Sequence, residues 1–129
     1  MQKTNRLESF RCAFSGIWYT IRTQRNAQIH VLVAIIIIVL GLILDLNLTE
    51  WGMLALTAGF VISTEMLNTV AEAAMDYATT EFNPQVKIIK DVAAGAVLVS
   101  AITAVIVGLL ILGPPLFQWL ILAINQLSN

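Results

Sequence analysis

The sequence predicts an all-α membrane protein with three transmembrane helices and an N-terminal amphipathic surface helix, and three observations predict this fold class. The chain has 129 residues, of which 58% are hydrophobic and only 12% charged, too apolar a composition for a soluble domain of this size. Three long stretches contain no Asp, Glu, Lys or Arg: 26–44, 51–64 and 92–129. All basic residues lie in the first 25 positions or at 87 and 90, before the last apolar stretch.

The charge distribution predicts how the chain is oriented. Lys and Arg beside membrane spans are preferentially retained on the cytoplasmic side, so we expect the N-terminus and the loop within 79–90 to be cytoplasmic. The other loop, around Asp45 and Glu50, has no basic residue and is expected outside. Three crossings of a single domain, 1–129, then place the C-terminus outside. Because there is no basic block, nucleic acid is not expected as a partner.

The segment 4–28 is the predicted surface helix. Its apolar side chains recur at three-and-four spacing among four arginines, at Phe10, Phe14, Ile17, Trp18 and Ile21. Such a helix lies in the lipid head-group region or packs against the spans of its own chain, and the sequence leaves both alternatives open.

The first predicted span is 29–44. Its β-branched run 35–39 would suit a buried strand, but the length of the apolar segment favours a helix. His30 lies at the cytoplasmic start of this span. We expect it to be an interfacial residue bonded to backbone or lipid phosphate, and it is not counted as a site residue.

The second predicted span, 49–78, with Thr49 as its N-cap, is polar over its second half. About 30 residues would measure about 45 Å, which exceeds the hydrocarbon core. Four polar residues recur at offsets of 0, 3, 7 and 11, at Glu65, Asn68, Glu72 and Asp76. At about 100° per residue they project within roughly 80° of one another, so one polar stripe begins inside the membrane and emerges toward the cytoplasm.

The third predicted span, 88–112, follows a loop containing Pro84 and opens with Lys90 and Asp91 at the depth where the stripe ends. Small residues recur every fourth position at Ala96, Ser100, Ala104 and Gly108, a pattern that permits close helix packing. We expect 113–115 (Gly-Pro-Pro) to break the helix and 115–127 to form a separate interfacial segment.

The polar stripe is the candidate functional site, because ionisable side chains within a span are costly and mark function by default. The alternative is helix–helix contact, with Asn68 bonding across an interface and a glutamate protonated or paired with Lys90. Carboxylates suit Mg²⁺, which binds through one or two of them together with substrate phosphates, whereas one Cys and one His disfavour zinc. A base, a metal ligand and a lysine are the parts of a phosphoryl-transfer site, although no P-loop or kinase Gly-rich loop is present.

Two motifs carry a family resemblance. The pattern Glu65-x-x-Asn68-Thr69-x-x-Glu72-x-x-x-Asp76 and the run 90–98 (KDVAAGAVL) resemble the signature of the prokaryotic integral-membrane diacylglycerol kinases. Two N-terminal segments, 13–16 and 25–30, are more similar to the undecaprenol kinase branch of that family.

The resemblance implies a homotrimer in the bacterial plasma membrane that transfers the γ-phosphate of Mg-ATP to the hydroxyl of a lipid alcohol, undecaprenol or diacylglycerol, at the cytoplasmic interface. It implies that Glu65 is the general base and that Glu72 binds the metal. The nucleotide site that it implies consists of Asn68, Asp76, Lys90 and Asp91.

One position departs from the family pattern. The family that this chain resembles usually has a glutamate just before the Arg-Asn pair, where it joins the metal site together with the acid at Glu72, and this chain has Gln24 there. An amide oxygen can ligate Mg²⁺ but supplies no charge, so we expect weaker metal binding, or activity that depends more on Glu72 and the ATP phosphates. Gln24 also leaves open a catalytically inactive homologue. A small proton-coupled multidrug transporter is the alternative from another class, but transporters of that kind resemble four-helix chains with the acid in the first span.

Overall fold

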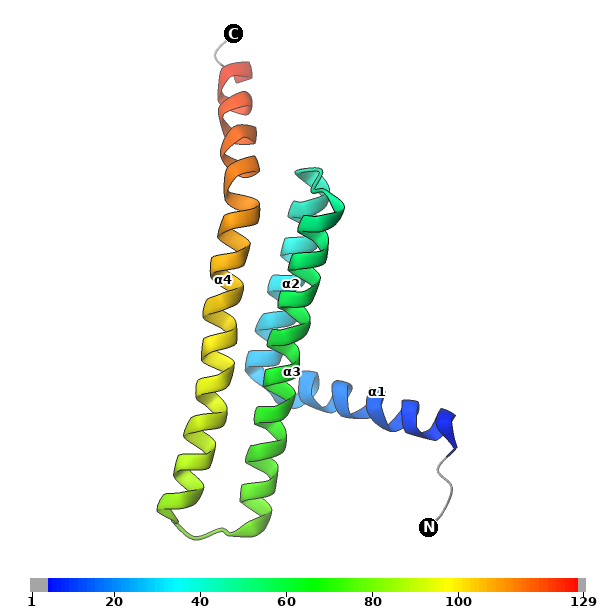
Figure 1. Ribbon diagram of the computed structural model, residues 1–129, viewed down its shortest axis with the longest axis vertical. Helices are drawn as coiled ribbons and strands as arrows, with labels where there is room; N and C mark the ends of the chain where they lie inside the picture. The colour runs from blue at the N-terminus through cyan, green and yellow to red at the C-terminus, as the bar shows by residue number, and fades with distance from the viewer. Residues whose placement is uncertain (1–4, 128–129) are drawn as a thin grey trace.

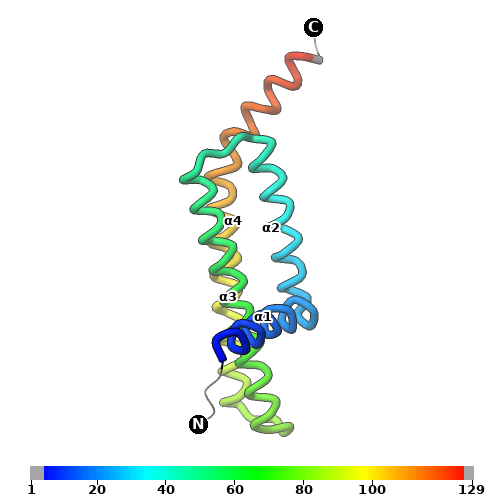
Figure 2. The backbone as a smooth tube through the Cα atoms, turned by 90° about the vertical axis from the view of Figure 1, so that its right-hand side faces the viewer, coloured from blue at the N-terminus to red at the C-terminus, as the bar shows by residue number. Residues whose placement is uncertain are grey.

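A computed structural model describes residues 5–127, which fold into four helices and no strand (Figure 1). They are α1 (Arg6–Thr23), α2 (Arg25–Ile43), α3 (Leu48–Ala78) and α4 (Pro84–Leu127). In Figures 1 and 2, α2, α3 and α4 run side by side, and α1 projects sideways from the start of α2. Helices α2, α3 and α4 are long and apolar enough to cross a membrane, so the predicted fold class is confirmed.

The junction between α1 and α2 lies earlier than predicted. The surface helix was expected to run over 4–28, but it ends at Thr23, and position 4 lies outside the described residues. Gln24 has extended backbone angles, φ −100° and ψ 117°, and its N–H still bonds to Thr20 O at 2.8 Å. The helical spacing of apolar residues could not locate this break, because the segments before and after Gln24 are both helices.

The apolar face of α1 is not covered by the rest of the chain. Phe10, Phe14 and Trp18 are 66%, 68% and 64% exposed. Of the two alternatives for this helix, insertion of its aromatic side chains into the lipid head-group region is therefore favoured.

The turn between α2 and α3 is held by a capping box. Asn47 Oδ1 accepts bonds from the N–H groups of Thr49 and Glu50 at 2.9 and 3.1 Å, and the backbone N–H of Asn47 donates to the Glu50 carboxylate at 2.8 Å. The N-cap is thus Asn47, and the predicted N-cap, Thr49, was wrong by two residues. Gly41 permits this turn, because a Cβ there would lie 2.7 Å from the Trp51 ring.

Helix α4 begins earlier and ends later than predicted. Pro84 occupies its first turn, where a missing N–H costs nothing, and Asn83 Oδ1 accepts a bond from Gln85 N at 2.9 Å. The predicted break at 113–115 was wrong, since the helix continues through Pro114 and Pro115. Gly113 lacks the Cβ that would meet the following proline ring, which removes part of the clash that normally ends a helix there. Figure 2 shows the last turns leaning away from the other helices.

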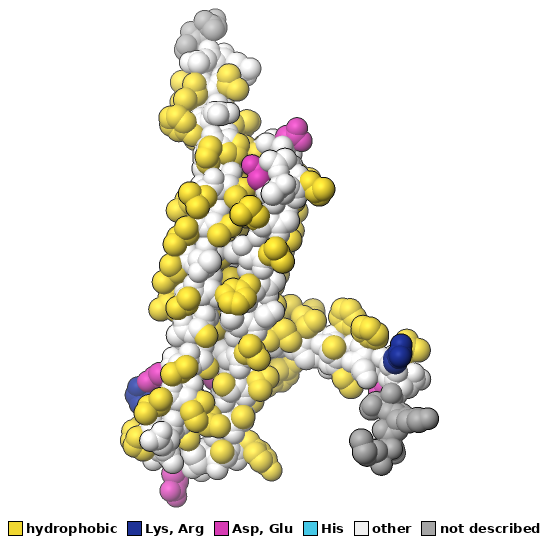
Figure 3. Space-filling view, in the orientation of Figure 1, with side chains coloured by type: hydrophobic (Ala, Val, Ile, Leu, Met, Phe, Trp, Pro, Cys, Tyr) yellow, Lys and Arg dark blue, Asp and Glu magenta, His cyan; other side chains and the backbone are white. Residues whose placement is uncertain are grey.

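The closest packing is between α3 and α4. Ser100 is fully buried, and its Oγ lies 2.8 Å from Thr64 Oγ1 across the interface. Val61 and Val97 are buried beside them. The outer surface of the helices is apolar over most of its length, with charged side chains gathered near the ends and on α1 (Figure 3), as lipid contact requires.

Candidate functional site

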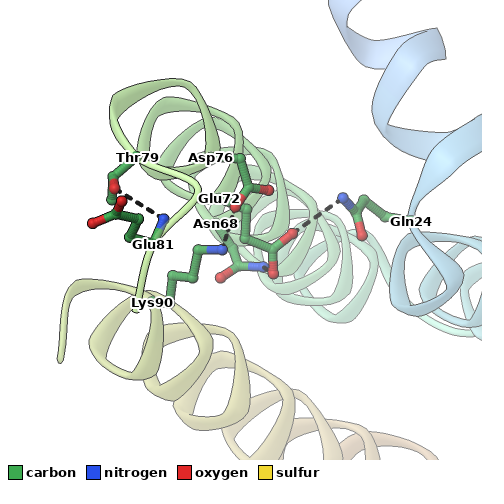
Figure 4. Close-up of polar contacts among 7 residues, drawn as sticks. All are labelled: Gln24, Asn68, Glu72, Asp76, Thr79, Glu81 and Lys90. Atoms are coloured by element: carbon green, nitrogen blue, oxygen red, sulfur yellow. Dashed lines mark hydrogen bonds and ion pairs between the residues drawn. The ribbon is translucent and has the colours of Figure 1, made fainter. Parts of the chain in front are cut away.

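The predicted polar stripe lies on one face of α3, near the end that leads to α4. Close to it are the α1–α2 junction and the first turns of α4 (Figure 4). The candidate site therefore combines three segments that are far apart in the sequence.

Glu72 is the centre of a small amide–carboxylate cluster. Gln24 Nε2 donates to its Oε2 at 3.3 Å, and Asn68 Nδ2 donates to its Oε1 at 3.1 Å. Both carboxylate oxygens are thereby held by neutral donors, one from α3 and one from the α1–α2 junction (Figure 4). The amide nitrogen of Gln24 faces Glu72, so the amide would have to rotate before its oxygen could share a metal ion with that carboxylate.

A second polar contact joins α3 to α4 further toward the α3–α4 loop. Lys90 forms an ion pair with Asp76, and both side chains remain accessible, at 36% and 70% exposure. Asp91 is directed elsewhere: it pairs with Lys87 on the exposed face of α4. The structure thus brings Lys90 to the stripe and leaves Asp91 in an exposed ion pair on α4, without a contact to the stripe among the described residues.

Glu65 occupies a different environment from the other acids. Its side chain is 1% exposed, and neither carboxylate oxygen has a hydrogen-bond partner among residues 5–127. The Oδ1 of Asn68, one turn further along α3, also has no partner within this part of the chain. Buried polar atoms are nearly always bonded, so these three oxygens need a partner that residues 5–127 do not supply.

A cavity of about 300 Å³ connects the site residues of α3 with α2. Its polar lining comes from Asn26, His30, Asn68 and Glu72, and apolar residues of α2 and α4 complete it. Asn26 and His30 were not among the predicted site residues. They are four residues apart and therefore lie on one face of α2, which is the sequence pattern that could have identified them. Only the packing of α2 shows that this face lines the cavity.

The oxygen atoms around Glu72 suit a hard cation that takes most of its other ligands from water and the substrate's phosphates. Within residues 5–127 no three His, Cys, Asp or Glu side chains converge. Glu72 is the one acid of its cluster, with Gln24 and Asn68 as amide neighbours. One carboxylate with neutral oxygen donors suits Mg²⁺ that keeps waters and phosphate ligands, and does not suit zinc.

The chain is similar to several known kinases. Residues 11–112 match the family model of prokaryotic diacylglycerol kinase. The chain is 42% identical over 109 residues to an undecaprenol kinase of Bacillus subtilis, covering 84% of this chain and 89% of that protein. It is 42% identical over 118 residues to a diacylglycerol kinase of Synechocystis, covering 91% of this chain and 67% of that protein.

A diacylglycerol kinase of Helicobacter pylori is 31% identical over 102 residues, covering 74% of this chain and 80% of that protein. No solved structure matches the chain significantly. The matched region extends from α1 to the last part of α4 that packs beside the other helices, and so includes every segment of the candidate site. On this match and on its three membrane-spanning helices, the chain belongs to the prokaryotic diacylglycerol kinase family of membrane lipid kinases.

Proposed function

We propose that this chain transfers the γ-phosphate of ATP to the hydroxyl of a membrane lipid alcohol at the cytoplasmic surface of the bacterial plasma membrane. The observation that carries the proposal is Glu65, a buried carboxylate with no partner on either oxygen among residues 5–127. It lies on the same helix face as Asn68 and Glu72, which line the polar cavity. An intramembrane acid on one helix face with polar residues that can hold a metal ion and phosphates suits a lipid kinase.

Glu65 acts as the general base in this proposal. Its carboxylate takes the proton from the lipid hydroxyl as the hydroxyl oxygen attacks the γ-phosphorus. The bond between that phosphorus and the bridging oxygen breaks, which leaves ADP and the lipid phosphate, and Glu65 then returns its proton to solvent. Burial of Glu65 keeps water from competing for the phosphoryl group.

The nucleotide lies toward the α3–α4 loop. Glu72 would hold Mg²⁺, and Gln24 is a neutral neighbour that could add an oxygen ligand after its amide rotates. The bound ion would neutralise charge on the ATP phosphates. Asn68 and Asp76 line the nucleotide site.

Lys90 supplies the positive charge on the α4 side of this site. Its ammonium group is held in place by Asp76 and remains accessible, which suits contact with a phosphate. Asp91 is assigned to the rim of the nucleotide site.

The acceptor is undecaprenol or diacylglycerol, and similarity favours undecaprenol. The Bacillus relative with that name is covered over 89% of its length, against 67% for the Synechocystis diacylglycerol kinase at the same identity. Basic residues at the α1 and α4 starts support a cytoplasmic site. Assembly into a homotrimer would cover the polar cavity, which three helices of one chain leave accessible from the side.

Transfer of labelled phosphate from ATP to extracted lipid tests the proposal, with the purified chain in nanodiscs and a panel of lipid alcohols. Label in lipid that requires Mg²⁺ supports the kinase. ATP binding without transfer to any alcohol would instead show an inactive homologue, and proton-driven dye efflux from vesicles would show a transporter.

A further inference from the structure

Glu65 lies between two cavities along α3. Besides the polar cavity, an apolar cavity of about 340 Å³ lies between α2 and α3. On α3 its lining begins at Trp51 and ends at Ile62, before Glu65, whereas the lining residues of the polar cavity, Asn68 and Glu72, come after it. The buried acid therefore stands at the level where the apolar cavity ends and the polar cavity begins.

His30 holds the corresponding place on α2. It is the residue that lines both cavities. One turn toward the α1–α2 junction, Asn26 lines the polar cavity alone, and one turn in the other direction, Ala34 lines the apolar cavity alone. Because both residues stand at the boundary between the two cavities, His30 lies across from Glu65.

The face of α3 that carries Glu65 is the face that lines these cavities. Val61 lines the apolar cavity and Asn68 the polar one, four residues before Glu65 and three residues after it. At about 100° per residue, both positions project within about 60° of Glu65. The Glu65 side chain, which is 1% exposed, is thus directed to the interior that His30 also faces.

The side-chain donors close to Glu65 on α3 already have partners. Thr64 Oγ1 donates to Val61 O at 2.8 Å, Thr69 Oγ1 donates to the backbone oxygen of Glu65 at 2.9 Å, and Asn68 Nδ2 donates to Glu72 at 3.1 Å.

The His30 imidazole is in a different situation. No hydrogen bond joins it to another residue within 5–127. A neutral imidazole carries one N–H donor in either tautomer. His30 therefore has a donor to spare and faces an acid whose two oxygens have no bond in this part of the chain.

We propose that His30 is a positioning residue for Glu65: its ring N–H donates to one carboxylate oxygen, so that the other oxygen is directed at the hydroxyl of the acceptor. This inference rests on the proposed lipid kinase activity and adds a residue to the same site. The structure shows the two side chains without this bond, and hydrogen bonds between catalytic groups often tighten only when the substrates are bound.

The bond would serve the base in two ways. An ionised carboxylate is costly to keep in apolar surroundings, and a hydrogen bond from His30 offsets part of that cost. The bond also fixes the direction of the carboxylate, which keeps its second oxygen in a reactive geometry. The proton still passes from the lipid hydroxyl to Glu65, so His30 neither gains nor loses a proton in the reaction.

Transfer of labelled phosphate by His30 variants in nanodiscs tests the inference. His30→Leu keeps a side chain of similar size without a donor, and kcat should fall about tenfold or more because a hydrogen bond to a charged group is lost. The KM for ATP should stay within about twofold of the parent value, since the bond acts on the base and not on the nucleotide. His30→Gln retains an N–H donor and should keep kcat within about threefold of the parent chain.

Gln28→Leu is the matched control, because it introduces the same side chain on the exposed side of α2, and it should retain the parent kcat. ATP binding shows that each variant is folded, and His30→Met takes the place of His30→Leu if that variant is not. A parent-like kcat in His30→Leu, or equal losses in His30→Leu and His30→Gln, would overturn the inference and leave the kinase assignment intact. Failure of the parent chain to phosphorylate any lipid alcohol would instead remove the proposed function and the inference with it.

Discussion

Gln24 donates a hydrogen bond to Glu72 at 3.3 Å, across 48 positions of the sequence. This contact fixes the junction between α1 and α2 against the acidic face of α3. It also puts a neutral amide where the family resemblance leads us to expect an acid, so the proposed metal site has Glu72 as its carboxylate and Gln24 as an uncharged neighbour.

Changing Gln24→Glu should therefore strengthen the binding of Mg²⁺. The new carboxylate would lie beside Glu72, and two like charges at this separation favour a cation between them. The Mg²⁺ concentration for half-maximal activity should fall about tenfold, an energy of about 1.4 kcal/mol. Gln28→Glu, with the same charge change on the exposed side of α2, should leave it unchanged. Equal metal requirements in all three proteins would contradict the role given to Gln24.

Lys90 and Lys87 lie three residues apart on α4 and offer a matched pair of variants. Lys90 meets Asp76 in the candidate site, whereas Lys87 pairs with Asp91 on an exposed surface. Lys90→Ala should raise the KM for ATP by about tenfold or more, because a hydrogen bond to a charged phosphate is lost. Lys87→Ala removes only the exposed partner of Asp91 at the proposed rim of the site and should raise the KM for ATP by a smaller factor, about twofold. Similar effects of the two substitutions on the KM for ATP would contradict a direct contact between Lys90 and an ATP phosphate.

The Thr64–Ser100 contact should stabilise the packing of α3 on α4. Removal of the two hydroxyls, singly and together, by Thr64→Val and Ser100→Ala measures their coupling in a double-mutant cycle. A hydrogen bond between membrane helices contributes about 0.6 kcal/mol on average, and we expect a coupling of about this size in the free energy of unfolding. Thr103→Val is the control, since the exposed Thr103 bonds only to Val99 O within its own helix. Additive effects of the two changes would mean that the hydroxyls do not interact.

The stripe on α3 could be predicted from the sequence because helical periodicity is a local property. Once 49–78 is a helix, the positions of Glu65, Asn68 and Glu72 on one face follow from their spacing. The overall class followed in the same way from the length of the apolar segments and the distribution of basic residues.

The parts of the site that the sequence did not predict depend on how helices meet. His30 was set aside as an interfacial residue, and only the packing of α2 on α3 shows that it lines the polar cavity with Asn68 and Glu72. Asp91 follows Lys90 directly, yet the two side chains point in different directions because consecutive helical residues differ by about 100°. Pro114 and Pro115 indicated a break, but the helix continues through them to Leu127. Proline in the sequence does not by itself decide whether a helix ends or continues with a kink.

Glu65→Gln is the most direct test of the proposed chemistry, because it keeps the size of the side chain and removes the base. ATP binding, followed by titration in nanodiscs with Mg²⁺ present, should stay within about twofold of the parent chain. Phosphate transfer to the lipid alcohol should fall by at least about a hundredfold, the contribution expected of a positioned general base. Turnover near that of the parent chain would contradict the assignment of Glu65 as the base.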